Sequence, residues 1–231
     1  MQYLGGKSKI VKPLSAYLKS QIGNRVFLEP FCGGLSVTCA MQGIEFRQAS
    51  DYSEPLITLY RAIQNGWVPP DSLSESEYTE LNRKRDPLDP MTAFAGYGCS
   101  FGAKFFGGYA RNVRGDNYAL SARNSLLRKF ERLSGVSFSH FSYETLNVDQ
   151  SCLVYCDPPY AETTGYSAVG SFDSAKFWAK CQDWAKSGAL VFVSEYKAPS
   201  FAECVWSLET KTELRTKEGR GDRTEKLFQV F

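Results

Sequence analysis

Apolar and polar positions follow two different periods along this chain, and the periods predict strands and helices in turn. Short apolar runs rich in β-branched and aromatic residues predict buried strands, whereas apolar residues spaced three and four apart predict helices. Strands are expected at residues 26–28, 44–51, 136–141, 151–156, 189–196 and 225–231. Helices are expected at residues 35–43, 55–66, 74–85, 121–133 and 173–186. This alternation predicts an α/β fold with a doubly wound sheet.

The alternation is interrupted between residues 54 and 132, where polar helices and a Gly- and aromatic-rich stretch replace it. The chain is therefore expected to form a discontinuous sheet domain, residues 1–53 and 133–231, with a second domain, residues 54–132, inserted into it. Residues 97–118 have no sustained helical period and predict a hairpin or a long loop inside the insertion.

The composition is that of a globular protein with room for one good core and a smaller lobe. The chain has 231 residues, of which 43% are hydrophobic and 23% charged. No stretch approaches the roughly 18 apolar residues of a membrane span, and the first ten residues have no apolar signal region. A cytoplasmic monomer without membrane contact or obligatory protein partner is expected; for a viral protein this would be the host cytoplasm.

Cysteine and histidine usage excludes several kinds of chemistry. The seven cysteines include no C-x-x-C pair, so reduced thiols are expected rather than disulfides or structural zinc. His140 is the single histidine, which leaves little for Ser-His-Asp, Cys-His or multi-histidine metal chemistry. No metal site is expected.

Charge is unevenly distributed although the net charge is only +2. Residues 1–26 hold five basic residues and no acid, and residues 97–132 hold seven basic and two acidic residues. Residues 53–96, by contrast, hold four basic and seven acidic residues. Two basic segments on a nearly neutral protein predict local contact with a polyanion.

Four short motifs stand at the ends of the predicted strands or before them. They are YLGGKSK at residues 3–9, LEPFCGG at residues 28–34, Asp51 after the second strand, and DPPY at residues 157–160. Asp51 lies 22 residues after Glu29, near the separation at which an acid of a dinucleotide-binding fold meets a ribose hydroxyl. Two successive prolines stiffen the turn after Asp157.

This series of motifs resembles the Dam-like, alpha-order DNA adenine-N6 methyltransferases of the D12 class. The order is the specific part, because DPPY or a glycine pair alone recurs by chance. The resemblance implies a Rossmann-like sheet that binds S-adenosylmethionine, with S-adenosylhomocysteine as product. It also implies that residues 54–132 form a mainly helical target-recognition domain with a β-hairpin. Bacterial or phage enzymes of this kind act alone or in restriction-modification systems.

An exocyclic amine needs help to act as a nucleophile, because its lone pair is delocalised into the base. The Asp157 carboxylate and the Pro158 carbonyl can each accept an amino hydrogen and so free the lone pair for in-line attack on a methyl group. Tyr160 offers a ring for stacking a base flipped out of the duplex. The expected catalytic residues are Asp157, Pro158 and Tyr160. The expected cofactor-binding residues are Tyr3, Lys7, Glu29, Phe31, Gly33, Gly34, Asp51 and Asp157.

The basic insertion is the expected contact with double-stranded DNA. Arginine reads a guanine edge, asparagine suits adenine, and lysine neutralises phosphate. The expected DNA-binding residues are Lys104, Arg111, Asn112, Arg114, Arg123, Asn124 and Arg128. Family resemblance makes a GATC-like site the default expectation.

Several alternatives stay open at the level of sequence. The same acceptors would serve methylation of the cytosine N4 amine, and a catalytically weak DNA-binding protein could keep the fold for occupancy alone. RNA or protein amide methylation is disfavoured because such relatives tend to carry NPPY, and a nucleotide-binding oxidoreductase would leave DPPY unexplained.

One departure from the family pattern bears on activity. The family pattern F-x-G-x-G reads FCGGL here, so Leu35 replaces the last glycine. Its side chain either narrows the cofactor site or packs between helix and sheet.

Overall fold

The computed structural model describes residues 6–159, 172–216 and 219–231. In this part of the chain seven strands form one sheet in the order β3-β2-β1-β4-β5-β7-β6. The strands are β1 Val26–Glu29, β2 Arg47–Asp51, β3 Val136–His140, β4 Cys152–Cys156, β5 Leu190–Ser194, β6 Ala202–Thr216 and β7 Gly219–Val230. The first five pair in parallel, and β7 runs antiparallel to β5 and β6.

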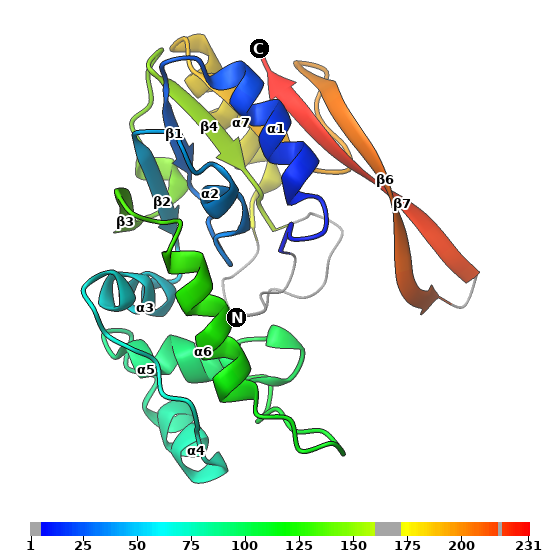
Figure 1. Cartoon of the computed structure of the whole chain (residues 1–231). Helices are drawn as coiled ribbons and strands as arrows, with labels where there is room; N and C mark the ends of the chain where they lie inside the picture. Colours follow the sequence, from blue (N-terminus) through cyan, green and yellow to red (C-terminus); the bar gives the residue numbers. More distant parts are fainter. Residues whose placement is uncertain (1–5, 160–171, 217–218) are drawn as a thin grey trace.

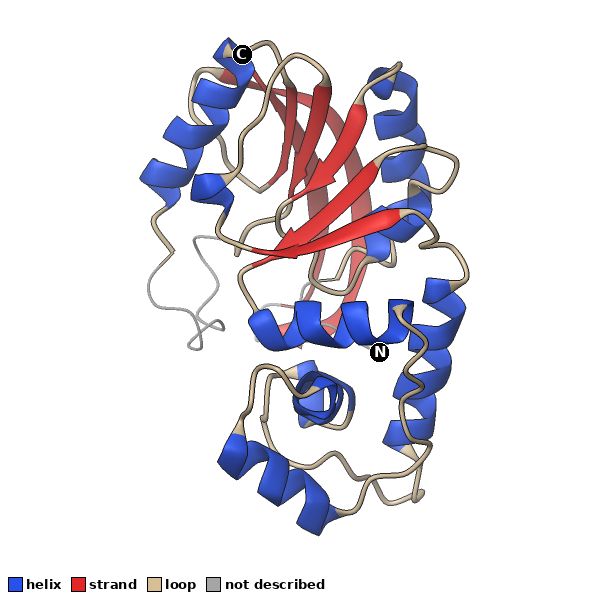
Figure 2. Cartoon of the chain, turned by 90° about the vertical axis from the view of Figure 1, so that its left-hand side faces the viewer, coloured by secondary structure: helices blue, strands red, loops and turns tan. Residues whose placement is uncertain are grey.

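Helices cover both faces of the sheet, which explains why its central strands are almost continuously apolar. Successive side chains of a strand point to opposite faces. Leu153 and Tyr155 of β4 pack against α1 (Val11–Ile22) and α2 (Ser36–Ala40), whereas Val154 and Cys156 pack against α7 (Ser174–Lys186). All four of these side chains are buried. The result is a three-layer α/β sandwich (Figures 1 and 2).

The segment between β2 and β3 is helical and lies on the side of the sheet towards which β4 points (Figure 1). Its elements are α3 Glu54–Gln64, α4 Glu75–Lys84, α5 Pro90–Ala93, the π-helix η1 Phe94–Gly98, the 3₁₀ helix η2 Phe101–Ala103 and α6 Tyr118–Phe130. A further 3₁₀ turn, η3 Tyr143–Thr145, follows β3. One apolar cluster runs from Ala49 of β2 through Tyr60 of α3 to Phe94 and to Leu126 of α6, so the helical lobe shares a core with the sheet.

The predicted strands and helices are all present in the structure, which adds the short helical elements α5, η1, η2 and η3 and two longer elements. The strand pattern and doubly wound order confirm the predicted Rossmann-like α/β fold. The helix α1 and the strand β6 were not predicted. Pro13 stands in the first turn of α1, where its missing N–H costs nothing, and lysines interrupt its apolar spacing. Strand β6 belongs to a long two-stranded hairpin with β7 that extends past the rest of the sheet (Figure 1).

The expected β-hairpin of the insertion takes a different form. Between residues 97 and 118 the described backbone makes a single isolated antiparallel bridge, Ser100 to Tyr109, followed by an irregular loop. The hydroxyl of Tyr78 of α4 lies 2.8 Å from Oγ of the bridge residue Ser100 and accepts from the N–H of Gly108, next to Tyr109, at 3.2 Å. Main-chain hydrogen bonds from Phe101 N to Gly108 O and from Ala110 N to Cys99 O, each 2.8 Å long, flank the bridge, so the turn is held by this short antiparallel contact and by Tyr78. No described helix is long and apolar enough to cross a membrane.

Candidate functional site

Three carboxyl groups come together at the ends of neighbouring parallel strands. Glu29 ends β1, Asp51 ends β2, and Asp157 directly follows β4. Because these strands are adjacent and parallel, their carboxyl ends share one edge of the sheet, where ligands of doubly wound folds bind. This edge faces the helical lobe (Figures 1 and 2).

The glycine loop after β1, residues 30–35, is fastened directly to β2. Gly33 N donates to Asp51 Oδ2 at 2.9 Å, and Cys32 N donates to the Ser50 carbonyl at 2.9 Å. Gly33 has a φ of 40°, a conformation that glycine adopts without steric cost. Ser53 N donates to the other Asp51 oxygen at 2.9 Å. Burial raises the pKa of Asp51, and these two N–H groups oppose that rise.

Two side chains of the helical lobe hold the carbonyls of the same loop. Tyr60 of α3 donates its hydroxyl hydrogen to Gly33 O at 2.5 Å, and Lys129 of α6 donates to Gly34 O. Burial lowers the pKa of Lys129. Lys129 lies on the same helix as the expected DNA-binding residues Arg123, Asn124 and Arg128, but its ammonium group contacts the glycine loop. Neither residue was predicted as part of this site, because nothing in the local sequence signals a contact between residues so distant in the chain.

Glu29 is a buried carboxyl group that anchors α2. Its Oε2 accepts from Thr38 N at 2.8 Å and from the Thr38 hydroxyl. Burial raises the pKa of Glu29 to about 8, and the nearby Asp157 and Asp51 carboxylates add to the rise. The side chain expected to bind cofactor therefore fixes the start of the helix that follows the glycine loop.

Lys7 lies between two carboxylates. Its Nζ is 2.7 Å from Asp157 Oδ1 and 3.9 Å from Glu225 Oε2 of β7. Only 6% of the Lys7 side chain is exposed, so this ammonium group is nearly withdrawn from solvent. The structure thus brings together the predicted residues Lys7 and Asp157. It adds Glu225, which the sequence did not single out.

Leu35 packs between helix and sheet, which decides between the two readings of its position. It is fully buried in the apolar cluster that joins the sheet to the helical lobe. Its backbone is left-handed, with φ 60° and ψ 23°, a conformation that glycine adopts more readily than a residue with a Cβ. The side chain contributes to the core at the cost of a strained backbone.

Other predicted residues have packing partners of their own. The centroid of the Phe31 ring lies 5.4 Å from that of Tyr143 and 5.6 Å from that of Phe177, within an aromatic cluster. Pro158 is buried and Gly34 is buried. Tyr3 and Tyr160 lie outside the described residues.

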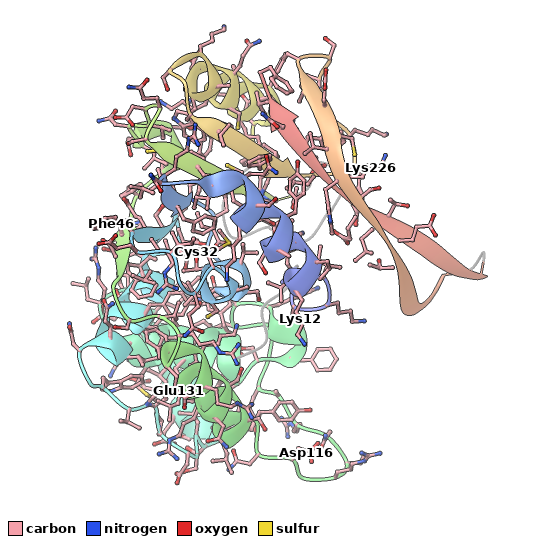
Figure 3. The ribbon with its side chains drawn as sticks, turned by 45° about the horizontal axis from the view of Figure 1, so that its top comes forward. Lys12, Cys32, Phe46, Asp116, Glu131 and Lys226 are labelled. Carbon is pink, nitrogen blue, oxygen red and sulfur yellow. The ribbon has the colours of Figure 1, made fainter. Side chains whose placement is uncertain are left out.

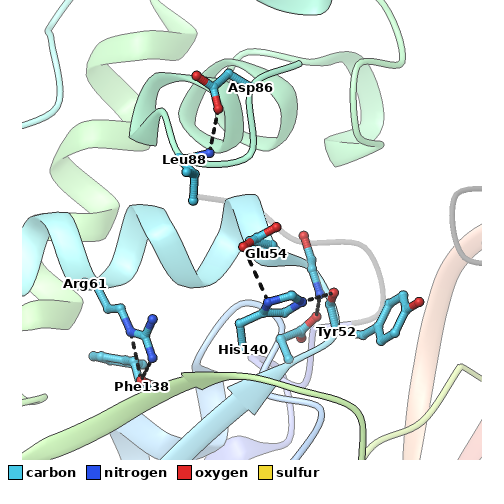
Figure 4. A network of polar contacts seen from close by, with 9 residues as sticks. Tyr52, Glu54, Arg61, Asp86, Leu88, Phe138 and His140 are labelled. Carbon is cyan, nitrogen blue, oxygen red and sulfur yellow. Dashed lines mark hydrogen bonds and ion pairs between the residues drawn. The ribbon is translucent and has the colours of Figure 1, made fainter. Parts of the chain in front are cut away.

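His140 belongs to a small polar network at the end of β3 (Figure 4). It pairs with Asp51 in the β2–β3 register, and its Nε2 lies 3.2 Å from the carbonyl oxygen of Tyr52. Its Nδ1 lies 3.7 Å from Glu54. His140 is the last residue of β3.

The predicted DNA-binding residues fall on the exposed surface of the helical lobe, with one partial exception. Arg111 pairs with Glu75 at 2.6 Å, and Asn112 closes the loop by accepting from the backbone N–H of Arg114 and of Asp116 at 3.1 Å. Asp116 marks this projecting loop in Figure 3. The exposed members of the set are Lys104, Arg111, Asn112, Arg114, Asn124 and Arg128. Arg123 is partly buried, and its Nε has no hydrogen-bond partner among the described residues.

Comparison with known families decides the classification. The model of the D12 class N6 adenine-specific DNA methyltransferases matches residues 3–88 and 100–216. The chain belongs to this family. The predicted resemblance is confirmed, and D12 membership indicates methyl transfer from S-adenosylmethionine.

Solved structures with similar folds include several methyltransferases. The rRNA methyltransferase aviRa from Streptomyces viridochromogenes has a TM-score of 0.45 and 14% identity, covering 99% of this chain and 88% of that one. The protein PH1948 from Pyrococcus horikoshii has a TM-score of 0.44 and 12% identity, with 99% and 86% covered. The D12 assignment rests on the family model.

The charges at the sheet edge fit S-adenosylmethionine. The Asp51 and Asp157 carboxylates are close enough to Glu29 to raise its pKa, so negative charge on one of these groups disfavours negative charge on the others. S-adenosylmethionine carries a sulfonium, an ammonium and two ribose hydroxyl donors, which would relieve this repulsion. Asp51 keeps lone pairs for hydroxyl donors after accepting two N–H groups.

Proposed function

We propose that this D12 protein methylates the N6 amino group of an adenine that has been flipped out of double-stranded DNA. The observation that carries the proposal is the position of Asp157. It leaves a fully buried strand at the cofactor edge, is followed by a buried proline, and is oriented by an ammonium group at 2.7 Å.

Asp157 and Pro158 supply the acceptors that the reaction needs. S-adenosylmethionine supplies an electrophilic methyl group when bound. The Asp157 carboxylate and the Pro158 carbonyl accept the two amino hydrogens, which favours a pyramidal nitrogen and directs its lone pair outward. Two fixed proline φ angles keep the turn rigid, so these acceptors need no reorganisation. Tyr160 is the proposed stacking ring.

The exposed basic residues of the helical lobe support a duplex as substrate. Lys104, Arg114 and Arg128 are exposed and make no ion pair among the described contacts, so they are available to phosphate or to guanine edges. Residues 54–132 are proposed as the target-recognition domain, with a GATC-like site as the first to test.

The proposal is tested in cells that lack adenine methylation. The chain is expressed there, and methylated bases in the DNA are quantified by mass spectrometry. We expect N6-methyladenine with the wild type and none with Asp157→Ala. Asp183→Ala is the matched control, because Asp183 is an exposed aspartate of α7, remote from the sheet edge, and this variant should methylate normally.

The nature of the methylated base separates the candidate reactions. N4-methylcytosine in place of N6-methyladenine would leave the site roles intact and change the substrate. No methylated base from a folded, soluble protein would refute the enzyme and leave a DNA-binding role. Sequencing that detects methylated bases directly, without bisulfite conversion, then gives the sequence around each modified base and tests the GATC-like site.

A further inference from the structure

Phe101 is a large apolar side chain that the helical lobe leaves in solvent. It is 71% exposed and belongs to none of the apolar clusters formed by the described residues. Two rings later in the same turn are packed: the centroid of Phe105 lies 4.8 Å from that of Tyr97, and the centroid of Phe106 lies 5.3 Å from that of Tyr78. A single exposed ring is ordinary on a protein surface, so its surroundings decide what it can do.

The turn holds the backbone of Phe101 in place. The N–H of Phe101 donates to the Gly108 carbonyl at 2.8 Å, and its carbonyl accepts from the N–H of Lys104 at 3.4 Å. The turn is so tight that a Cβ at Gly107 would lie 2.9 Å from Cβ of Lys104 and 3.3 Å from the Phe101 carbonyl oxygen. The Tyr78 hydroxyl accepts from the N–H of Gly108 and so ties the turn to α4. A ring presented from a fixed backbone loses little conformational freedom on binding.

The same turn lies close to the cofactor edge of the sheet. The Tyr97 hydroxyl lies 3.3 Å from Ser53 Oγ, and Ser53 is the residue whose N–H donates to Asp51. Phe101 follows Tyr97 by four residues, so the backbones of these two residues are at most about 14 Å apart. That distance is about four steps along one strand of a duplex. A duplex that delivers a base to this edge therefore comes within reach of Phe101.

The charge around Phe101 favours nucleic acid over a protein surface as its partner. Lys104, in the same turn, is exposed, and residues 97–132 hold seven basic residues against two acidic ones. Lysine neutralises phosphate, whereas an aromatic ring stacks on a base whatever its identity. When a target base leaves the duplex, the bases beside it lose a stacking surface. Apolar side chains such as phenylalanine are suited to cover an unstacked step.

We propose that Phe101 stacks on the bases that are left uncovered when the target base leaves the duplex, and so stabilises the flipped state. This inference rests on the proposed function. Phe101 is a positioning residue, because its ring contacts the duplex and not the reacting amine, the methyl group or Asp157. Lys104 binds the phosphate backbone beside the ring.

The first test measures binding to two duplexes, with S-adenosylhomocysteine present. One duplex carries an abasic site in place of the target adenosine, at the sequence found to be methylated or at GATC if none is methylated. The other is continuous and has a scrambled site, so no base is flipped. Phe101→Ala should lower affinity for the gapped duplex about tenfold and leave affinity for the continuous duplex unchanged, whereas Phe101→Trp should keep both.

Phe46→Ala is the matched control for binding. Phe46 is 62% exposed and precedes β2, at the opposite end of that strand from Asp51 (Figure 3). This variant should bind both duplexes as wild type does. An equal loss of affinity for both duplexes in Phe101→Ala overturns the inference. Unchanged affinity for the gapped duplex also overturns it and leaves the ring to a protein surface.

The second test uses methyl transfer. Phe101→Ala should slow single-turnover methylation about tenfold, while its affinity for S-adenosylmethionine, measured by calorimetry, equals that of wild type. The defect should shrink to less than about threefold when the target adenine faces a mismatched base, because a mismatch lowers the cost of flipping. A defect of equal size on matched and mismatched duplexes overturns the inference. An inactive wild type refutes the proposed function instead, and the binding test still decides whether Phe101 covers the gap.

Discussion

Leu35 offers a test of backbone strain at the cofactor loop. Its left-handed φ of 60° costs a residue with a Cβ about 1–2 kcal/mol relative to a right-handed conformation. Its side chain is fully buried, and truncating a buried leucine to alanine costs about 2–5 kcal/mol. Packing therefore outweighs strain, which explains why leucine is tolerated here.

The comparison of alanine with glycine isolates the strain. Leu35→Ala loses the packing and keeps the Cβ, whereas Leu35→Gly loses the packing and also relieves the strain. Glycine also lowers the free energy of unfolding by about 0.5–1 kcal/mol, because it gives the unfolded chain more conformational freedom. We expect Leu35→Gly to be more stable than Leu35→Ala by about 0.5–1 kcal/mol, and both to be less stable than wild type.

The assay is urea unfolding, followed by circular dichroism, of both variants and of a matched pair at Leu18. Leu18 is also fully buried but lies in α1 in ordinary helical geometry. There glycine should be less stable than alanine by about 1 kcal/mol. The order of the two substitutions should thus be opposite at the two positions. If the glycine variant were less stable than the alanine variant at both positions, the inferred backbone strain at Leu35 would be refuted.

Three further predictions concern the rest of the site. Glu29→Gln should remove a pH dependence of stability: because burial raises the folded-state pKa from 4.5 to about 8, the contribution of the neutral acid is fully present below pH 4.5 and lost as pH rises to about 8. Urea midpoints across this range should fall with pH in wild type, and an equal fall in the variant would contradict the assignment. Tyr60→Phe leaves the Gly33 carbonyl without its 2.5 Å donor and should cost about 1–3 kcal/mol in unfolding free energy, with weaker cofactor binding by calorimetry; unchanged values for both would count against this contact. Arg114→Gln should weaken DNA binding and reduce the slope of log affinity against log salt by about 1, whereas Arg25→Gln, on the opposite side of the sheet domain, should change neither.

The strands and the acidic ends of the strands were accessible from the sequence because both depend on local patterns. Apolar runs fix which segments become central strands, and the parallel order places their carboxyl ends together. Asp51 and Asp157 were therefore identified correctly as edge residues. The helix α1 was missed because lysines interrupt its apolar spacing, and β6 because half of its length extends beyond the core.

The sequence by itself determined the α/β order and the residues that end each strand, since these follow from short-range periodicity, and the order of its motifs carried the resemblance to the D12 family. Only the tertiary structure decided which side chains support them. Tyr60 and Lys129 reach the glycine loop from 27 and 95 residues away, and Glu225 reaches Lys7 across the whole chain. Such contacts depend on how helices and strands pack in three dimensions, so no local pattern encodes them. The left-handed backbone of Leu35 was likewise hidden, because its core neighbours, and not its own preference, stabilise that conformation.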